Sequence, residues 1–310
     1  MNYRTNVTEN GNIYGKWKIA PDTWCITDSW NNFVYLLEGK RKAMLIDTCS
    51  GEGNIREFVE KITDKEIMVV NTHGHFDHTG GNACWPEVWM TREAALHAKE
   101  PFAGIYREWF YAKPYPDYKI NYLNDGERVD LGDREVEVIS IPAHSEGSIA
   151  LLDKNTRSIF TGDEIEAGQV IWFVRNEAVS IGELAQQHHA NMLKLKERRS
   201  EYDWIWPAHN GLPLYPDDYL DDYIALDEEI LEGKQTVLPD TAGFRFPTDS
   251  QAIMNPFMDY GKLYRVEKGL ASFVYSEGKS TYHNEKTENN DLAKDAGGMM
   301  DVSQSTKGNS

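Results

Sequence analysis

Apolar residues occur in short alternating or continuous segments through the first 50 residues of the chain. Segments of this length that are rich in β-branched and aromatic residues are typical of strands, and the turn at 38–40 predicts a hairpin. The expected strands are residues 16–19, 23–26, 33–37 and 43–46. We therefore expect this part of the chain to form antiparallel strands.

Beyond residue 50, segments with helical spacing alternate with short apolar runs. Apolar positions three and four residues apart predict helices, whereas short β-branched runs predict buried strands. The expected helices are residues 54–62, about 91–99, 181–199 and 217–232, and the expected strands are residues 66–70, 135–141, 157–160 and 203–206. Two further strands, at 263–266 and 271–275, are expected to form a terminal hairpin.

Four of these strands are followed by side chains of the kind that bind metals. In the order of the strands that precede them, these residues are His73, His75, Asp77, His78, His144, Asp163 and His209. Side chains just beyond the carboxyl ends of strands lie where open α/β sheets usually place their sites. The placement indicates one metal site assembled from four separate strand ends.

The segment 71–81 carries the densest part of this pattern, with three imidazoles and one carboxylate within six residues. Imidazole nitrogens and carboxylate oxygens bind zinc at about 2.0–2.2 Å. Gly74, Gly80 and Gly81 allow backbone conformations that side chains would forbid, so the ligands can turn inward from one tight loop. A metal site is favoured over a polar surface loop.

The chain resembles the metallo-β-lactamase-fold hydrolases, in the dinuclear branch that includes hydroxyacylglutathione hydrolases and lactonases. The motifs that carry the resemblance are His73-x-His75-x-Asp77-His78, the turn at 142–148, Phe160-Thr-Gly-Asp163, Pro207-Ala-His209 and the strand end at 45–48. The resemblance covers roughly residues 15–235. It implies an α/β fold of four αβ/βα layers, in which two mixed β-sheets pack face to face with helices outside.

The resemblance also implies how the seven residues divide between two metals. His73, His75 and His144 would hold one metal, and Asp77, His78 and His209 the other. Asp163 would bridge the two. Two zinc ions are expected, with iron or manganese as the alternatives. In β-lactam-hydrolysing relatives the position of Asp163 is often occupied differently, so the aspartate counts against antibiotic hydrolysis.

Two divalent ions about 3.5–4 Å apart would make a bridging water acidic and clamp the attacking and leaving oxygens. The hydroxide would attack a polarised carbonyl carbon. Asp77, close to that water, is the candidate catalytic residue for holding or passing its proton. Asp47 is expected either to orient a histidine or the ligand loop, or to end a strand in a plain turn.

The composition fits one hydrolase domain, expected over residues 1–276, followed by a polar and disordered tail at 277–310. The chain has 310 residues, of which 40% are hydrophobic and 26% charged. It lacks an apolar run of about 18 residues that could span a membrane, and its N-terminus lacks the apolar segment of a signal peptide. Cys25, Cys49 and Cys84 are too scattered for a disulfide framework. A cytoplasmic location without membrane attachment is the default expectation.

The net charge of −18 argues against a nucleic-acid partner. A surface that follows phosphates needs clustered Lys and Arg. The densest basic stretch, residues 194–199, lies at the end of an expected helix, where it complements the helix dipole. A small-molecule substrate is expected instead.

Aromatic residues crowd the segment 101–124, which we interpret as an insertion beside the metal site. A lid over the substrate, packing within the core and a homodimer contact remain open for it. The segment 171–174 is a second candidate for an apolar wall. These rings favour a substrate with a bulky apolar group.

The substrate class stays broad at this point: an ester, lactone, thioester or amide. Lactonase relatives place a tyrosine shortly after the bridging aspartate, and residues 164–166 contain none. Glutathione-binding relatives add a basic helical segment, and the corresponding region here is acidic.

The competing interpretation is a mononuclear iron enzyme on the same fold that resembles a sulfur dioxygenase. It would leave Asp77, His78 and His209 without metal. The other four histidines are expected not to be ligands: His97 as a surface residue, His188 and His189 because helix neighbours point about 100° apart, and His283 within the tail.

Overall fold

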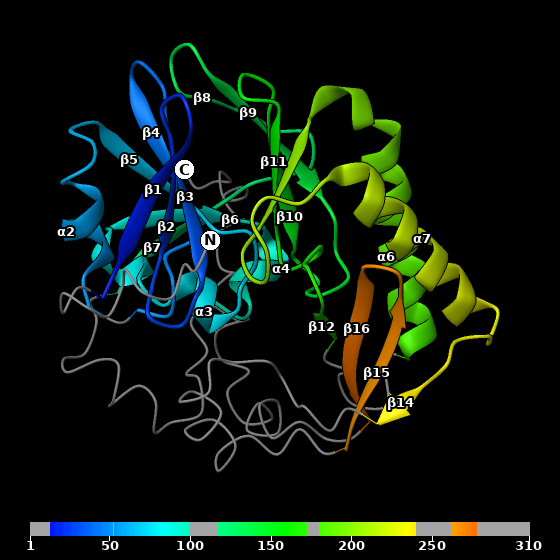
Figure 1. The fold of residues 1–310 in the computed structure, drawn as a ribbon. Helices are drawn as coiled ribbons and strands as arrows, with labels where there is room; N and C mark the ends of the chain where they lie inside the picture. The colour runs from blue at the N-terminus through cyan, green and yellow to red at the C-terminus, as the bar shows by residue number, and fades with distance from the viewer. Residues whose placement is uncertain (1–12, 52, 99–116, 173–179, 240–261, 278–310) are drawn as a thin grey trace, which may run out of the picture.

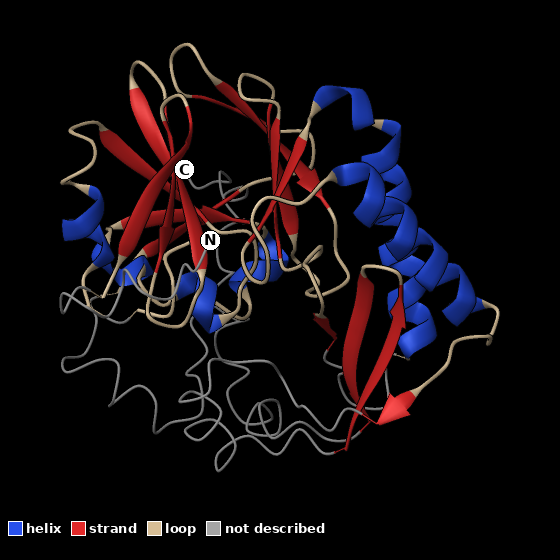
Figure 2. Ribbon diagram, in the orientation of Figure 1, coloured by secondary structure: helices blue, strands red, loops and turns tan. Residues whose placement is uncertain are grey.

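The first sheet of the computed structural model contains the strands of the N-terminal part of the chain (Figures 1 and 2). The structure describes residues 13–51, 53–98, 117–172, 180–239 and 262–277. In order across the sheet, the strands are β1 (Gly15–Ala20), β2 (Thr23–Thr27), β3 (Phe33–Glu38), β4 (Lys42–Ile46), β5 (Glu66–Val70), β6 (Glu87–Met90) and β7 (Lys119–Tyr122). The first four pair antiparallel and the last four parallel, so the sheet is mixed.

The second sheet has five strands and is also mixed. In order across the sheet they are β13 (Trp204–Pro207), β11 (Ser158–Gly162), β10 (Ile149–Asp153), β9 (Glu135–Ser140) and β8 (Arg128–Asp130). Only β11 and β13 run parallel, and the other neighbours are antiparallel. The three strands predicted at 135–141, 157–160 and 203–206 all belong to this sheet.

The two sheets pack face to face because each presents an apolar face to the other. Tyr35, Met44 and Val70 of the first sheet share one buried core with Leu151 and Phe160 of the second. Burial of such side chains is worth roughly 1.5–3 kcal/mol each. This shared core is the middle of the molecule.

Helices cover the outer faces of both sheets (Figure 2). The short helices α2 (Ile55–Val59) and α4 (Arg92–Ala95) pack on the first sheet. The long helices α6 (Ile181–Glu197) and α7 (Pro216–Leu231) pack on the second. The expected four-layer α/β fold is confirmed.

Local sequence explains where these helices begin. Ser180 and Glu183 form a capping box at the start of α6, in which each side chain bonds the other residue's backbone N–H. Asn54 and Thr91 accept backbone N–H bonds at the starts of α2 and α4. Pro216 begins α7, where a missing N–H costs nothing. The shorter elements are α3 (Phe76–Thr79) and two 3-10 turns, η1 (Asn82–Cys84) and η2 (Arg199–Glu201).

A third sheet of four strands lies against α7, and the sequence pattern did not predict it as a sheet (Figure 1). Its order is β12 (Val170–Trp172), β16 (Ala271–Glu277), β15 (Lys262–Lys268) and β14 (Leu238–Pro239). The predicted terminal hairpin is confirmed as β15 and β16. β12 pairs parallel with β16, so the chain just after Asp163 joins a sheet made mostly of C-terminal strands.

Two expectations about aromatic segments need revision. Residues 119–122, placed in the insertion, form β7 at the edge of the first sheet. Trp172 is not a wall of a substrate site, because it is 1% exposed and stacks on Phe273 with ring centroids 3.6 Å apart. The remainder of the insertion up to residue 116, residues 173–174 and the tail from 278 lie outside the described residues.

Candidate metal centre

The loop after β5 carries four of the candidate ligands and is held in place by backbone contacts. The carbonyl of His78 accepts hydrogen bonds from the backbone N–H and the hydroxyl of Thr48, and from the side-chain amide of Asn71. A Cβ atom on Gly80 would lie 2.3 Å from the carbonyl of Ser50, so only glycine lets the loop approach so closely. These contacts hold the loop in one conformation.

Three histidines form the first group of candidate ligands. Nδ1 of His75 lies 3.0 Å from Nε2 of His73 and 2.9 Å from Nε2 of His144. All three residues are buried. His73 and His75 come from the loop after β5, and His144 comes from the connection between β9 and β10.

In His73 and His144, the partner of Nδ1 shows which ring nitrogen carries the hydrogen. Nδ1 of His144 donates to the carbonyl of Ile171 at 2.6 Å, because a carbonyl can only accept. The hydroxyl of Thr72 donates to Asp47, so it accepts from Nδ1 of His73. The neutral rings of His73 and His144 thus both turn a lone pair toward His75. Two lone pairs directed at the same point repel each other unless a cation lies between them. The three histidines therefore fit a bound metal ion.

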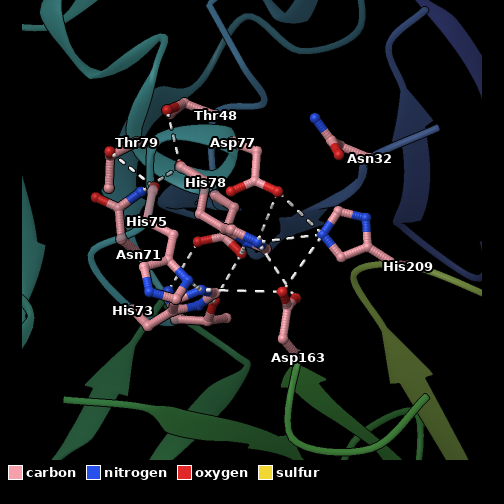
Figure 3. Close-up of polar contacts among 12 residues, drawn as sticks. Asn32, Thr48, Asn71, His73, His75, Asp77, His78, Thr79, Asp163 and His209 are labelled. Carbon is pink, nitrogen blue, oxygen red and sulfur yellow. Dashed lines mark hydrogen bonds and ion pairs between the residues drawn. The ribbon is translucent and has the colours of Figure 1, made fainter. Parts of the chain in front are cut away.

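The second group contains two histidines and two aspartates (Figure 3). Nε2 of His209 lies 3.3 Å from Oδ2 of Asp77 and 3.4 Å from Oδ2 of Asp163. Nε2 of His78 lies 3.2 Å from Oδ1 of Asp163. The ligand atoms in each of the two groups lie within 4.8 Å of one another.

Asp163 lies between the two groups. Its Oδ2 atom is 3.4 Å from Nε2 of His144 in the first group and 3.4 Å from Nε2 of His209 in the second. A carboxylate that reaches both sets of nitrogens can bridge two metal ions. The structure thus brings all seven predicted residues together, with the carboxylate of Asp163 near nitrogens of both groups.

The histidines of the two groups differ in the direction in which their pKa values are shifted. Burial, together with the charge of His78, holds the pKa of His73 well below its usual range, and burial also lowers the pKa of His144. Burial opposes charge on His78 and His209 as well, yet the nearby carboxylates, Asp163 first among them, raise both pKa values well above the usual range. A metal entering the second group would therefore displace protons, whereas burial favours the neutral form of His73 and His144 in the first group.

The second group is the more accessible of the two. The side chains of Asp77 and His209 are 20% and 21% exposed, whereas that of Asp163 is 8% exposed and those of His73 and His78 are 1% exposed. Asp77 and His209 therefore form the more solvent-exposed side of the centre.

Asp47 orients the ligand loop, as one of its two expected roles required. Its carboxylate accepts from the backbone N–H and the hydroxyl of Thr72, each at 2.7 Å, and from Nδ1 of His78 at 2.9 Å. That bond turns Nε2 of His78 toward Asp163. Carboxylates behind metal-binding histidines commonly fix the tautomer in this way.

The remaining histidines of the described chain lie outside both groups. His97 is 5% exposed, so the expectation of a surface position was wrong: the chain folds it in behind Gly74. His188 is fully buried, and the side chain of His189 lies 3.5 Å from Glu228. His283 lies outside the described residues.

No helix in the described ranges has the length and apolar character that crossing a bilayer requires.

Sequence reasoning missed Glu164 and the role of His188. Glu164 is buried, and its carboxylate accepts the backbone N–H groups of Ala143 and His144. A signal was available for His188, which falls in register with Leu184 and Leu195 on the apolar side of its helix. A polar residue at such a position needs a buried partner.

Comparison with known proteins agrees with this geometry. The profile of the Metallo-beta-lactamase superfamily matches residues 28–239. The acyl-coenzyme A thioesterase MBLAC2 of Homo sapiens is 27% identical in an alignment of 172 positions that covers 44% of this chain and 60% of the human protein. A hydroxyacylglutathione hydrolase of Nostoc is 28% identical in an alignment of 189 positions that covers 58% of this chain and 64% of that protein. The chain thus spans less than two thirds of either relative.

Solved structures show the same fold. A metallo-beta-lactamase from Pontibacter korlensis superimposes with a TM-score of 0.52 at 18% identity, over 69% of this chain and 99% of that one.

Proposed function

Because this chain belongs to the metallo-beta-lactamase superfamily, we propose that it is a metal-dependent hydrolase with a site for two divalent ions. The position of Asp163 carries the proposal, since its carboxylate faces both groups of candidate ligands. Zinc is the metal that we propose, because imidazole and carboxylate are the donors of catalytic zinc sites.

Bound metals would supply an activated water and stabilise the negative charge that develops on the carbonyl oxygen. The residues then have separate tasks. His73, His75 and His144 present three ring nitrogens close together, and Asp47 accepts from Nδ1 of His78 and so turns Nε2 inward. Asp77 is a partly exposed carboxylate of the centre, so it is placed to hold the proton of the attacking water.

We propose an acyl thioester as the substrate class among carbonyl-centred esters. The printed names of two relatives supply the reason, because one acts on acyl-coenzyme A and the other on hydroxyacylglutathione. In both, a small thiol carries the acyl group. A small-molecule substrate also suits a chain with a net charge of −18 better than a nucleic acid does.

The test combines metal content with turnover. Plasma mass spectrometry of protein purified without chelators should find close to two zincs per chain. Thiol release from acyl-coenzyme A and S-acylglutathione should exceed hydrolysis of matched oxygen esters. One iron per chain with oxygen-dependent sulfur chemistry would favour the mononuclear alternative instead.

Asp163→Ala is the decisive variant. It should retain at most one metal and lose at least about 100-fold in kcat, because a catalytic metal contributes several kcal/mol and about 1.4 kcal/mol corresponds to a factor of ten. His189→Ala, in a histidine outside both groups, is the control and should turn over normally. Full activity of Asp163→Ala would refute the two-metal mechanism.

A further inference from the structure

A chain of buried hydrogen bonds runs from α7 through α6 to the candidate metal centre. Oδ2 of Asp227 on α7 lies 2.7 Å from Nδ1 of His188 on α6. Nε2 of the same ring lies 3.0 Å from the backbone carbonyl of Glu164. Asp227, His188 and Glu164 are each 0% exposed. None of the three belongs to either group of candidate ligands.

The geometry fixes how His188 bonds. A carbonyl oxygen can only accept, so Nε2 of His188 must carry a hydrogen and donate it to Glu164. Three aromatic rings, Trp172, Tyr223 and Phe273, surround the imidazole with centroids 5.0–5.7 Å away. Packing and bonding together hold the ring in one orientation.

The side chain of Glu164 extends the chain of bonds to a candidate ligand. Its Oε1 atom accepts the backbone N–H groups of Ala143 and His144, each at 2.9 Å. Two bonds from one buried carboxylate oxygen fix the orientation of this turn. The same turn is held from α6 by Asn191, whose side-chain amide donates to the carbonyl of Pro142 at 3.0 Å.

Burying a carboxylate is costly, so the position needs an explanation. An unpaired buried charge is strongly disfavoured. If the carboxylate had no role at this buried position, an apolar side chain would be the more stable choice. Instead, the carboxylate of Glu164 accepts a hydrogen bond from the backbone N–H of His144. Glu164 directly follows Asp163 in the chain. Its hydrogen bonds therefore act on the turn that carries His144.

We propose that Glu164 and His188, anchored by Asp227, are positioning residues that hold His144 in place for the metal bound by the three histidines. The inference rests on the proposed function, because it assumes that His144 binds a metal. Outer partners of metal ligands typically contribute about 10–100-fold to metal affinity. The α6–α7 pair would thus set the affinity of a centre to which it contributes no ligand.

The test measures Zn²⁺ affinity of the full chain by competition with a chromophoric chelator. His144→Ala and His209→Ala first identify which binding step belongs to which group. Glu164→Leu should then weaken the step lost in His144→Ala by about 10–100-fold and leave the other step unchanged. Glu164→Gln keeps an oxygen acceptor and should restore most of the affinity. The visible spectrum of the Co²⁺ form should change in Glu164→Leu and return in Glu164→Gln.

A matched control separates positioning from stability. Arg134 and Asp153 form another buried ion pair, at the end of β10 remote from the candidate ligands. Asp153→Leu should destabilise the fold without changing either Zn²⁺ step. If Asp153→Leu and Glu164→Leu weaken Zn²⁺ binding alike, the inference is overturned.

A second variant covers the case in which Glu164→Leu does not fold. His188→Leu combined with Asp227→Leu removes both charged partners, and such paired replacement is often tolerated. It should weaken the same Zn²⁺ step. Wild-type affinity in that variant, while the wild-type chain binds two zincs, would overturn the inference and leave the proposed function standing. Fewer than two zincs in the wild-type chain would instead defeat the proposed function.

Discussion

A single aspartate, Asp47, determines which nitrogen of His78 faces the candidate metal centre. It occupies a left-handed backbone conformation with φ of 64°, at the point where β4 ends. This conformation is uncommon for residues other than glycine, and aspartate is among the residues that adopt it most readily. From there the carboxylate reaches both Thr72 and His78.

Replacing this carboxylate by an amide should disturb the tautomer more than the fold. In Asp47→Asn, the amide can still accept from the N–H of Thr72, but its NH₂ group then faces Nδ1 of His78. The ring would move its proton to Nε2, which points into the centre. We expect a loss of about 10–100-fold in Zn²⁺ affinity at the second group, measured by chelator competition.

The exposed pair of Arg56 and Glu60 offers a control for this prediction. Glu60→Gln changes the same functional group on the surface and should leave Zn²⁺ affinity unaltered. An Asp47→Asn protein that binds two zincs as tightly as wild type would contradict the orienting role.

The residues of the site differ in how far sequence could identify them. His73 to His78 stand in one dense motif, and the other candidate ligands follow predicted strands, so spacing alone was enough to name them. Glu164 and His188 become meaningful only when α6 packs on the second sheet. Their pairing is a property of tertiary packing, which no local pattern encodes.

At the scale of elements, α4 is wedged between the two loops that supply the three histidines. A Cβ on Gly74 would lie 2.2 Å from the carbonyl oxygen of Ala94, and a Cβ on Gly147 would lie 2.2 Å from the backbone nitrogen of the same residue. Thr91, the N-cap of α4, also donates its hydroxyl to the carbonyl of Gly147 at 2.8 Å. One short helix thus sets the spacing of both loops.

A side chain at this contact should force the elements apart. Gly147→Ala would bring its methyl group against backbone atoms that cannot rotate away, so we expect a loss of about 1–3 kcal/mol in the free energy of unfolding. Denaturant titration measures it. Gly182→Ala, near the start of α6 with space around it, is the matched control and should be neutral or stabilising by up to about 1 kcal/mol. Equal stabilities for the two variants would show that the loops can shift.

At the scale of the whole molecule, the candidate ligands lie where the two sheets meet. The backbone N–H of Ile149 in the second sheet donates to the carbonyl of Thr72 in the ligand loop. On the other side, Tyr35 of the first sheet donates its hydroxyl to the carbonyl of Pro207, two residues before His209. Metals bound here would join both halves of the fold.

Removing the metals should therefore lower the stability of the entire domain. Ions held at 100 times their Kd contribute about 2.7 kcal/mol, and about 1 kcal/mol shifts Tm by about 2–4 °C in a domain of this size. We expect chelation to lower Tm by about 5–10 °C in a thermal scan, and a smaller shift in Asp163→Ala. An unchanged Tm after complete metal removal would contradict this prediction.

The sequence predicted the four layers of the fold better than it predicted the third sheet. Alternating helical and strand spacing, with the resemblance, predicted the four layers. The third sheet depends on the parallel pairing of Val170 with Phe273, which are far apart in the chain. Strands so far apart in the chain are not joined by a turn, and no local periodicity links them. Their pairing depends on tertiary packing, in a core that they share with α7.

The order of the candidate ligands along the chain has a consequence for biosynthesis. A chain growing from its N-terminus possesses all three histidines of the first group once residue 144 has been added, whereas the second group lacks His209 until residue 209 has been added. At roughly 5–20 residues per second, several seconds separate the two moments. The residues of the first group are thus all synthesised before those of the second group are complete.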